Sequence, residues 1–136
     1  ALSRGVEVAV THRRGPWLAQ ASWLYANTAF SSRLRLPQVP RNQGSAILTW
    51  TRGRSALSGG LRASSLQFED DLNTFILPGF AVWHLSANHH LAGPLSATFA
   101  VENAFNREYL AGYTPTPMLA SPRLWRAGLR FDFPRP

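Results

Sequence analysis

Three histidines lie close together in the sequence and could in principle ligate a metal ion: His84, His89 and His90. In an extended strand, His84 and His90 would share a face but would lie about 20 Å apart, at roughly 3.3 Å per residue. His89 would point to the other face. One ion could not be shared by these residues along one strand, so the sequence predicts no metal site and we interpret the histidines as polar strand or turn residues.

An acidic stretch offers the oxygen ligands that a hard cation such as calcium prefers. It contains Glu69, Asp70, Asp71 and Asn73. The stretch lacks the glycine and the regular ligand spacing of a calcium loop. We therefore interpret it as a solvated loop between strands.

Catalytic chemistry is not indicated. The chain has no cysteine, which excludes a thiol nucleophile, a thiolate metal site and a disulfide framework. Serines are common but none lies in a Gly-x-Ser-x-Gly elbow. The carboxylates Glu102, Glu108 and Asp132 fall in different expected elements. We predict that the chain is not an enzyme and needs no cofactor.

The net charge of +7 comes from arginine alone, since all fourteen basic side chains are arginines. A basic chain raises nucleic acid or an anionic membrane surface as partners. The arginines are spread over turns, a loop and strand faces, and a nucleic-acid site would require a basic patch or stripe. Nucleic-acid binding is therefore not predicted.

Alternation of apolar and polar residues dominates the chain and predicts an all-β fold. Seven strands of about 8 to 12 residues are expected, close to the 9 to 11 that cross a bilayer. Their centres are Val6–Val10, Trp17–Tyr25, Ala46–Trp50, Leu61–Phe68, Ala81–Ala87, Ala97–Val101 and Trp125–Phe133. The fourth has the poorest alternation. No stretch approaches the roughly 20 apolar residues of a membrane helix.

Short and long links alternate strictly between these strands. The short links are 13–16, 52–55 and 92–94, and the long links span roughly 27–42, 69–79 and 103–122. Outer-membrane barrels alternate in this way, with short periplasmic turns and longer extracellular loops. The pattern predicts an antiparallel up-and-down meander that forms part of a transmembrane β-barrel.

The period of two assigns side chains to two opposite faces. The residues expected to face lipid are Ala81, Trp83, Leu85, Ala97, Phe99, Val101, Ala127, Leu129 and Phe131. Those expected to face the lumen are Ser86, Asn88, Ser96, Thr98, Arg126 and Arg130. The aromatic residues fall mainly on the lipid set, as in the aromatic girdles of membrane barrels.

Five segments resemble the C-terminal part of TonB-dependent receptors, in the same order along the chain. Val101–Tyr109 is similar to that family's Asn-Leu-Phe-Asp/Asn-x-x-Tyr motif, with Ala104 in place of the leucine. The other four are 4–7 (Arg-Gly-Val-Glu), 39–42 (Val-Pro-Arg-Asn), 77–80 (Leu-Pro-Gly-Phe) and 121–123 (Ser-Pro-Arg).

The last strand resembles the signal by which the barrel-assembly machinery recognises its clients. Gly128, Phe131 and Phe133 carry this likeness. A glycine lets backbones approach closely, and outward aromatics anchor at the membrane interface. Such chains usually end at the last aromatic, whereas here Pro134-Arg135-Pro136 follow.

The resemblance implies a role in the bacterial outer membrane. Family members form a 22-stranded barrel around an N-terminal plug, bind TonB through a short box, and import siderophore–iron complexes, cobalamin and other scarce solutes. Residues 1–136 are then expected to be a C-terminal barrel segment without plug and box, in contact with outer-membrane lipid and dependent on the barrel-assembly machinery. A passive porin fragment and a secreted soluble β-domain that binds sugar or protein are the alternatives.

The ligand-facing surface of such a barrel is expected at the outer loops and upper lumen. Arg33, Arg35, Tyr109 and Tyr113 fall there and are the candidate ligand-binding residues, because guanidinium and aromatic groups suit anionic chelates. The alternative is that they are exposed loop residues without a ligand role.

Overall fold

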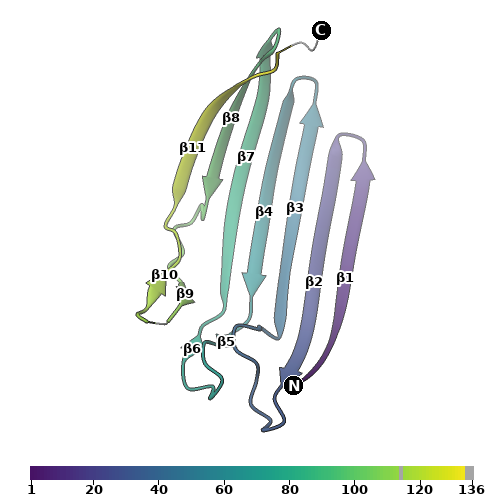
Figure 1. Cartoon of the computed structure of the whole chain (residues 1–136). Coiled ribbons are helices and arrows are strands. Elements are labelled where there is room, and N and C mark those ends of the chain that lie inside the picture. Colours follow the sequence, from purple (N-terminus) through teal and green to yellow (C-terminus); the bar gives the residue numbers. More distant parts are fainter. Residues whose placement is uncertain (114, 134–136) are drawn as a thin grey trace.

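Seven long antiparallel strands form one curved sheet in the computed structural model, which describes residues 1–113 and 115–133 (Figure 1). The long strands are β1 (Leu2–Arg14), β2 (Trp17–Ala29), β3 (Asn42–Arg52), β4 (Ser55–Ser64), β7 (Phe80–Ala92), β8 (Leu95–Glu102) and β11 (Leu124–Phe131). Two small two-stranded sheets lie in the loops, made by β5 (Gln67–Phe68) with β6 (Ile76–Leu77) and by β9 (Leu110–Gly112) with β10 (Met118–Leu119).

The long strands pair in the order β1-β2-β3-β4-β7-β8-β11, so each lies beside the next long strand in the chain. This arrangement confirms the predicted antiparallel meander. The predicted fourth strand was misplaced, however: it runs from Ser55 to Ser64 rather than over Leu61–Phe68. Ser65 and Leu66 already lie in a loop, and Gln67 and Phe68 belong to a separate short strand.

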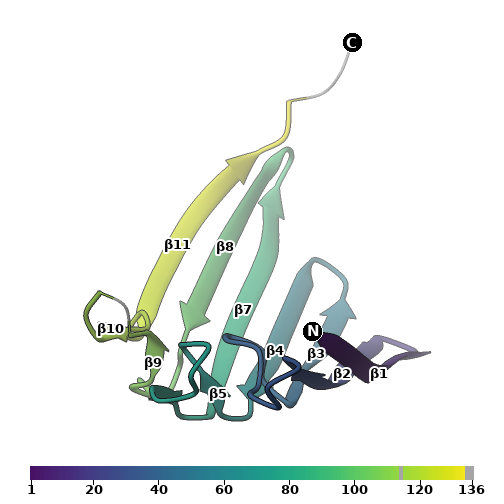
Figure 2. The same cartoon turned by 60° about the horizontal axis from the view of Figure 1, so that its bottom comes forward.

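The sheet curves without closing (Figures 1 and 2). Within the described residues, β1 and β11 each pair with a neighbour on one side only. The described residues contain no helix, and hence none that is long and apolar enough to cross a membrane. The predicted tail Pro134-Arg135-Pro136 lies outside the described residues.

Tight turns gather at one end of the sheet, the turn end, and the three long loops gather at the other, the loop end (Figure 1). Each tight turn has two residues, and its first residue is a glycine with positive φ: Gly15, Gly53 or Gly93. A type II′ hairpin turn requires such a residue at this position. The positions of these three tight turns confirm the short links that the sequence predicted.

Residues that pair across neighbouring strands share a face, and the register separates two faces throughout. The apolar face carries Trp83, Leu85, Phe99, Leu129 and the other residues expected to meet lipid. The polar face carries Arg62, Ser86, Thr98, Arg126 and Arg130. Arg126 and Leu129 lie on opposite faces, so the predicted separation of these residues into two faces is confirmed.

The sheet has almost no dry core. Among the described residues only Leu77, Val82 and Val101 are buried hydrophobics, while Leu129 is 73% exposed and Trp83 is 45% exposed. Val101 lies on the apolar face as predicted, but it is covered because Leu85 and Trp125 flank it on the neighbouring strands. The apolar face thus lacks a covering layer within this chain.

Asp70 closes the loop between β5 and β6. Its carboxylate accepts hydrogen bonds from Phe75 N (2.8 Å), Thr74 Oγ1 (2.7 Å) and Thr74 N (3.1 Å). Desolvation alone would raise the pKa of Asp70, but the hydrogen bonds from Phe75 and Thr74 outweigh it and lower the pKa to about 2. Asp70 in the acidic stretch therefore stabilises the conformation of the loop in which it lies.

We predict that residues 1–136, expressed alone, aggregate in water. Burial of apolar surface stabilises a fold by about 25 cal/mol per Å². Without lipid or a covering layer, the apolar face of the sheet loses this stabilisation, which over a whole face amounts to many kcal/mol. Net stability is only about 5 to 15 kcal/mol, and open strand edges add a route to aggregation. Size-exclusion chromatography with and without detergent tests this. A monodisperse monomer in water with a cooperative melt would contradict it.

We predict that ionised Asp70 stabilises its loop at neutral pH. Since the folded pKa lies below the ordinary value of about 3.9, this stabilisation is complete above that value and is lost as the pH falls towards 2. Amide exchange at Thr74 and Phe75, corrected for its intrinsic pH dependence, should follow that profile in detergent. Asp70→Asn should accelerate exchange at neutral pH, whereas Asp71→Asn, at an exposed neighbour, should not. Equal exchange in both variants would refute the prediction.

Candidate functional site

Hydrogen bonds join the first loop (30–41) to the second (65–79). Arg35 N donates to Asn73 Oδ1 (2.8 Å), and Asn73 Nδ2 donates back to Arg35 O (2.9 Å). Gln38 adds a backbone bond to Phe68 O (2.6 Å) and a side-chain bond to Glu69 Oε2 (3.2 Å). Asn73 adopts positive φ, which is tolerable for asparagine and lets its side chain reach both loops.

The two predicted arginines of the first loop differ in their surroundings. Arg35 is half-buried: its guanidinium donates to Val39 O (3.2 Å) and lies 5.3 Å from the centre of the Phe68 ring. Burial, and then the charge of Arg41, lower the pKa of Arg35. Arg33 is exposed at positive φ, and only its backbone N is bonded within the loop, to Phe30 O. Arg35 therefore serves the loop packing, while Arg33 points into solvent.

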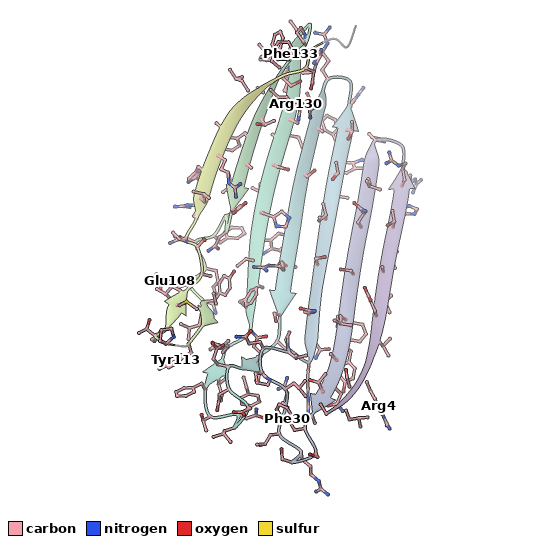
Figure 3. All side chains as sticks on the ribbon, viewed as in Figure 1. Arg4, Phe30, Glu108, Tyr113, Arg130 and Phe133 are labelled. Carbon is pink, nitrogen blue, oxygen red and sulfur yellow. The ribbon has the colours of Figure 1, made fainter. Side chains whose placement is uncertain are left out.

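Stacked aromatic rings link the third loop (103–123) to the rest of the chain. Tyr109 stacks on Phe80 of β7, with ring centres 4.0 Å apart. Tyr113 stacks on Phe75 of the second loop at 5.0 Å. The two tyrosines belong to different contacts, and Figure 3 shows Tyr113 in the third loop, at the side of the molecule away from β1. The structure therefore does not bring the four predicted ligand residues into one site.

Arg62 joins Tyr109 at the loop end of the polar face. Its Nη2 donates to Tyr109 Oη (3.0 Å), and its guanidinium carbon lies 5.2 Å from the centre of the Phe80 ring. Both arginine and tyrosine stay accessible, since Arg62 is exposed and Tyr109 is half-buried. We call Arg62, Phe80 and Tyr109 the arginine clamp.

Two hollows of the polar face meet at Arg62. One, of about 380 Å³, is lined by Arg62, Tyr109, His84, Glu102 and their neighbours. The other, of about 410 Å³, is lined by Arg62, Phe80, Glu7, Ser45 and their neighbours beneath the first loop. Glu102 is ion-paired with Arg126, which offsets its negative charge beside the first hollow. The clamp thus places one guanidinium at the rim of both hollows.

Sequence reasoning found Tyr109 but missed Arg62. A signal was available: Ser58, Gly60, Arg62 and Ser64 occupy one face of β4 in a period of two. The fourth strand was predicted too late in the chain, at Leu61–Phe68, so this polar face of β4 was not recognised. Gly60 on that face is covered by the His84 imidazole, with which a Cβ would overlap.

The Val101–Tyr109 motif builds the start of the third loop. The Asn103 side chain donates to Arg107 O (2.8 Å) and Ser121 O (3.1 Å), and it accepts from Arg107 N (2.7 Å). Asn106 Oδ1 accepts from Arg123 N (2.9 Å). Asn103 and Asn106 both adopt positive φ. The two asparagines fold the chain so that Tyr109 returns over Phe80.

The predicted assembly residues lie along β11 and just after it. A Cβ at Gly128 would lie 3.0 Å from Thr98 Oγ1, whose hydroxyl donates to Gly128 O (3.2 Å), so the glycine permits close strand approach. Phe131 and Phe133 contact each other at 4.8 Å between ring centres, and Figure 3 shows Phe133 at the turn end. Their role in assembly stays a prediction.

The histidines are distributed over separate contacts. His89 Nδ1 lies 2.8 Å from Ser55 Oγ, and His90 Nδ1 lies 3.4 Å from Ser96 Oγ. In residues 1–113 and 115–133, no group of three or more His, Cys, Asp and Glu residues could hold a metal ion.

Comparisons with known proteins agree with this architecture. The family model "TonB dependent receptor-like, beta-barrel" matches residues 1–104. A comparison with curated protein sequences found no significant match.

Three solved structures illustrate the similarity of fold. BauA, the ferric preacinetobactin receptor from Acinetobacter baumannii, has a TM-score of 0.83 at 22% identity, over 96% of this chain and 22% of that one. The siderophore receptor PiuA from Acinetobacter baumannii has 0.81 at 15%, over 95% and 21%. The ferric yersiniabactin uptake receptor FyuA from Yersinia pestis has 0.79 at 20%, over 96% and 23%.

The chain spans about a fifth of the length of these receptors. Its open seven-stranded sheet therefore corresponds to part of a larger barrel, and its apolar face is the one that meets lipid. From the family match over residues 1–104 we conclude that the chain belongs to the TonB-dependent receptor β-barrel family, whose members are transport proteins of the bacterial outer membrane and not enzymes.

Proposed function

We propose that residues 1–136 are the C-terminal seven strands of a TonB-dependent active importer of an anionic metal chelate such as a siderophore–iron complex. In this proposal a longer polypeptide supplies the other strands, the plug and the TonB box. The observation that carries the proposal is the family match over residues 1–104. The fold it shares with receptors for ferric preacinetobactin and ferric yersiniabactin supports it.

The arginine clamp gives the proposal its chemistry. Siderophore complexes expose carboxylate, catecholate or hydroxamate oxygens, which a planar guanidinium binds through charge-assisted hydrogen bonds. Arg62 is held in place from two sides by Phe80 and Tyr109, so little side-chain entropy remains to be lost on binding. A lumen-facing guanidinium at the rim of two hollows suits capture of an anion that arrives through the loops.

Energy dependence separates this proposal from a passive porin. Cells that produce the complete receptor should accumulate the radiolabelled ferric chelate, and the uptake should cease when tonB is deleted or when the inner-membrane proton gradient is dissipated. Uptake of radiolabelled cobalamin, as a second candidate solute, is measured in the same assay. Uptake that continues without TonB would identify a passive pore and overturn the proposal.

We predict that Arg62→Gln in the complete receptor weakens chelate binding about tenfold, because a charge-assisted hydrogen bond contributes roughly 1.5 kcal/mol. Tyr109→Phe keeps the stack on Phe80 and should have a smaller effect. The matched control is Arg13→Gln, on the polar face but at the turn end. Binding isotherms on whole cells provide the measurement. An equal loss for Arg62→Gln and Arg13→Gln would exclude a specific role for the clamp.

A further inference from the structure

Two arginines lie on the apolar face at the turn end, where the sheet meets the periplasmic side of the membrane. Arg14 pairs with Trp17, and Trp17 pairs with Trp50, so these three residues share that face in one row. Arg52 follows Trp50 by two residues and therefore points the same way. Both arginines are exposed. Neither arginine can contact a solute in the lumen, because its side chain projects from the apolar face of the sheet and the lumen is on the polar side.

The surrounding turn end is strongly basic. Within residues 11–18, 50–57, 88–97 and 128–133 there are five arginines, Arg13, Arg14, Arg52, Arg54 and Arg130, and one carboxylate, Asp132. Arg130 is paired with Asp132 at 2.8 Å, and Arg54 donates to Leu91 O at 3.3 Å. Among the described residues, the side chains of Arg14 and Arg52 make no hydrogen bond or ion pair. Their charges are available to an anion.

An apolar hollow of about 300 Å³ lies on the same face, further from the turns than Arg14 and Arg52, neither of which lines it. Small residues form its floor: Ala19, Ala21, Ala46 and Gly59. Larger apolar side chains, among them Leu48, Leu61 and Trp83, border it. The row of Ala21 and Ala46 lies four residues deeper than Trp17 and Trp50, or about 13 Å towards the membrane centre.

His12 connects the two parts. It lies on the apolar face between Val10 and Arg14 and lines the hollow. From the turn end towards the membrane centre, the apolar face therefore presents a basic residue (Arg14), then His12, and then the alanines of the hollow. A phospholipid has the same sequence of groups: a phosphate, polar ester groups and an acyl chain.

A hydrogen bond and an aromatic contact connect the strands that carry these groups. Thr51 N donates to Pro16 O (2.8 Å), which ties the β1–β2 turn to β3 next to Arg52. Trp17 and Trp50 contact each other at 6.5 Å between ring centres. Arg14 and Arg52 are two strands apart and offset by two residues, so their Cα atoms lie about 12 Å apart. Two extended arginine side chains can converge on one phosphate across that gap.

We propose that this surface binds one anionic phospholipid of the inner leaflet, with its phosphate between Arg14 and Arg52 and an acyl chain in the hollow over Ala21 and Ala46. Charge complementarity selects an anionic headgroup, and the hollow selects a lipid over a soluble phosphate. Interfacial tryptophans and basic side chains anchor membrane proteins at this depth. The inference rests on the family and the register, and it is independent of the transported solute.

The test uses the intact barrel in phosphatidylethanolamine vesicles that contain a titrated fraction of phosphatidylglycerol brominated in its acyl chains. Bromine quenches nearby tryptophans, so Trp83, which borders the hollow, reports occupancy together with Trp17 and Trp50 beside the arginines. Arg14→Gln or Arg52→Gln should weaken the apparent affinity about fivefold, as expected for one basic side chain near an anionic surface. The matched control is Arg4→Gln, on the same strand and face but at the loop end (Figure 3).

A second pair of variants tests the hollow without touching charge. Ala46→Phe fills the hollow and should reduce quenching, whereas Ala81→Phe, on the same face but outside the hollow, should not. Heat-modifiable migration on gels verifies that each variant forms a barrel. Glycerol phosphate added to the buffer should not compete.

Three results would overturn the proposal. The first is equal quenching by brominated phosphatidylethanolamine and phosphatidylglycerol, which would indicate ordinary lipid contact. The second is an equal effect of Arg4→Gln and Arg14→Gln. The third is a receptor dimer in the wild type that Ala46→Phe dissociates, since a second copy would then occupy the hollow.

Discussion

Every backbone N–H and C=O group that crosses a bilayer must find a partner inside the protein, and the rest of this structure depends on that requirement. The long strands meet it by pairing along their length, from thirteen residue pairs between β1 and β2 to seven between β7 and β8. Because the hydrogen bonds between neighbouring strands hold the sheet together, the sheet needs no buried hydrophobic core. Side chains are then distributed by solvent alone: apolar towards lipid, polar towards water.

That simplicity explains why much of the fold could be predicted from sequence. The period of two, the turn glycines and the alternating link lengths are local signals, and they located six of the seven long strands. β4 was misplaced because Gly59 and Gly60 break its alternation and because Ser64 and Ser65 continue its polar composition into the loop. The short strands β5, β6, β9 and β10 were not predicted, since two or three residues carry no period.

The site was less predictable because its contacts join residues far apart in the chain. Tyr109 was recognisable from a motif, yet the partners that position it are Phe80 and Arg62. Arg35 appeared to be a ligand candidate by type, whereas its bonds to Asn73 and Val39 serve packing. The residue types indicated which chemistry was available at the loop end, and only the three-dimensional arrangement showed where it gathers.

The cross-linked loops have a consequence for how specificity can evolve. Arg35 and Asn73 join the first loop to the second, and Phe75 and Tyr113 join the second to the third. An insertion or a shortened segment in any one loop would break a contact that another loop needs. New solute preferences should therefore arise by side-chain exchange on a preserved backbone, or by replacement of all three loops together through recombination, more readily than by change in one loop at a time.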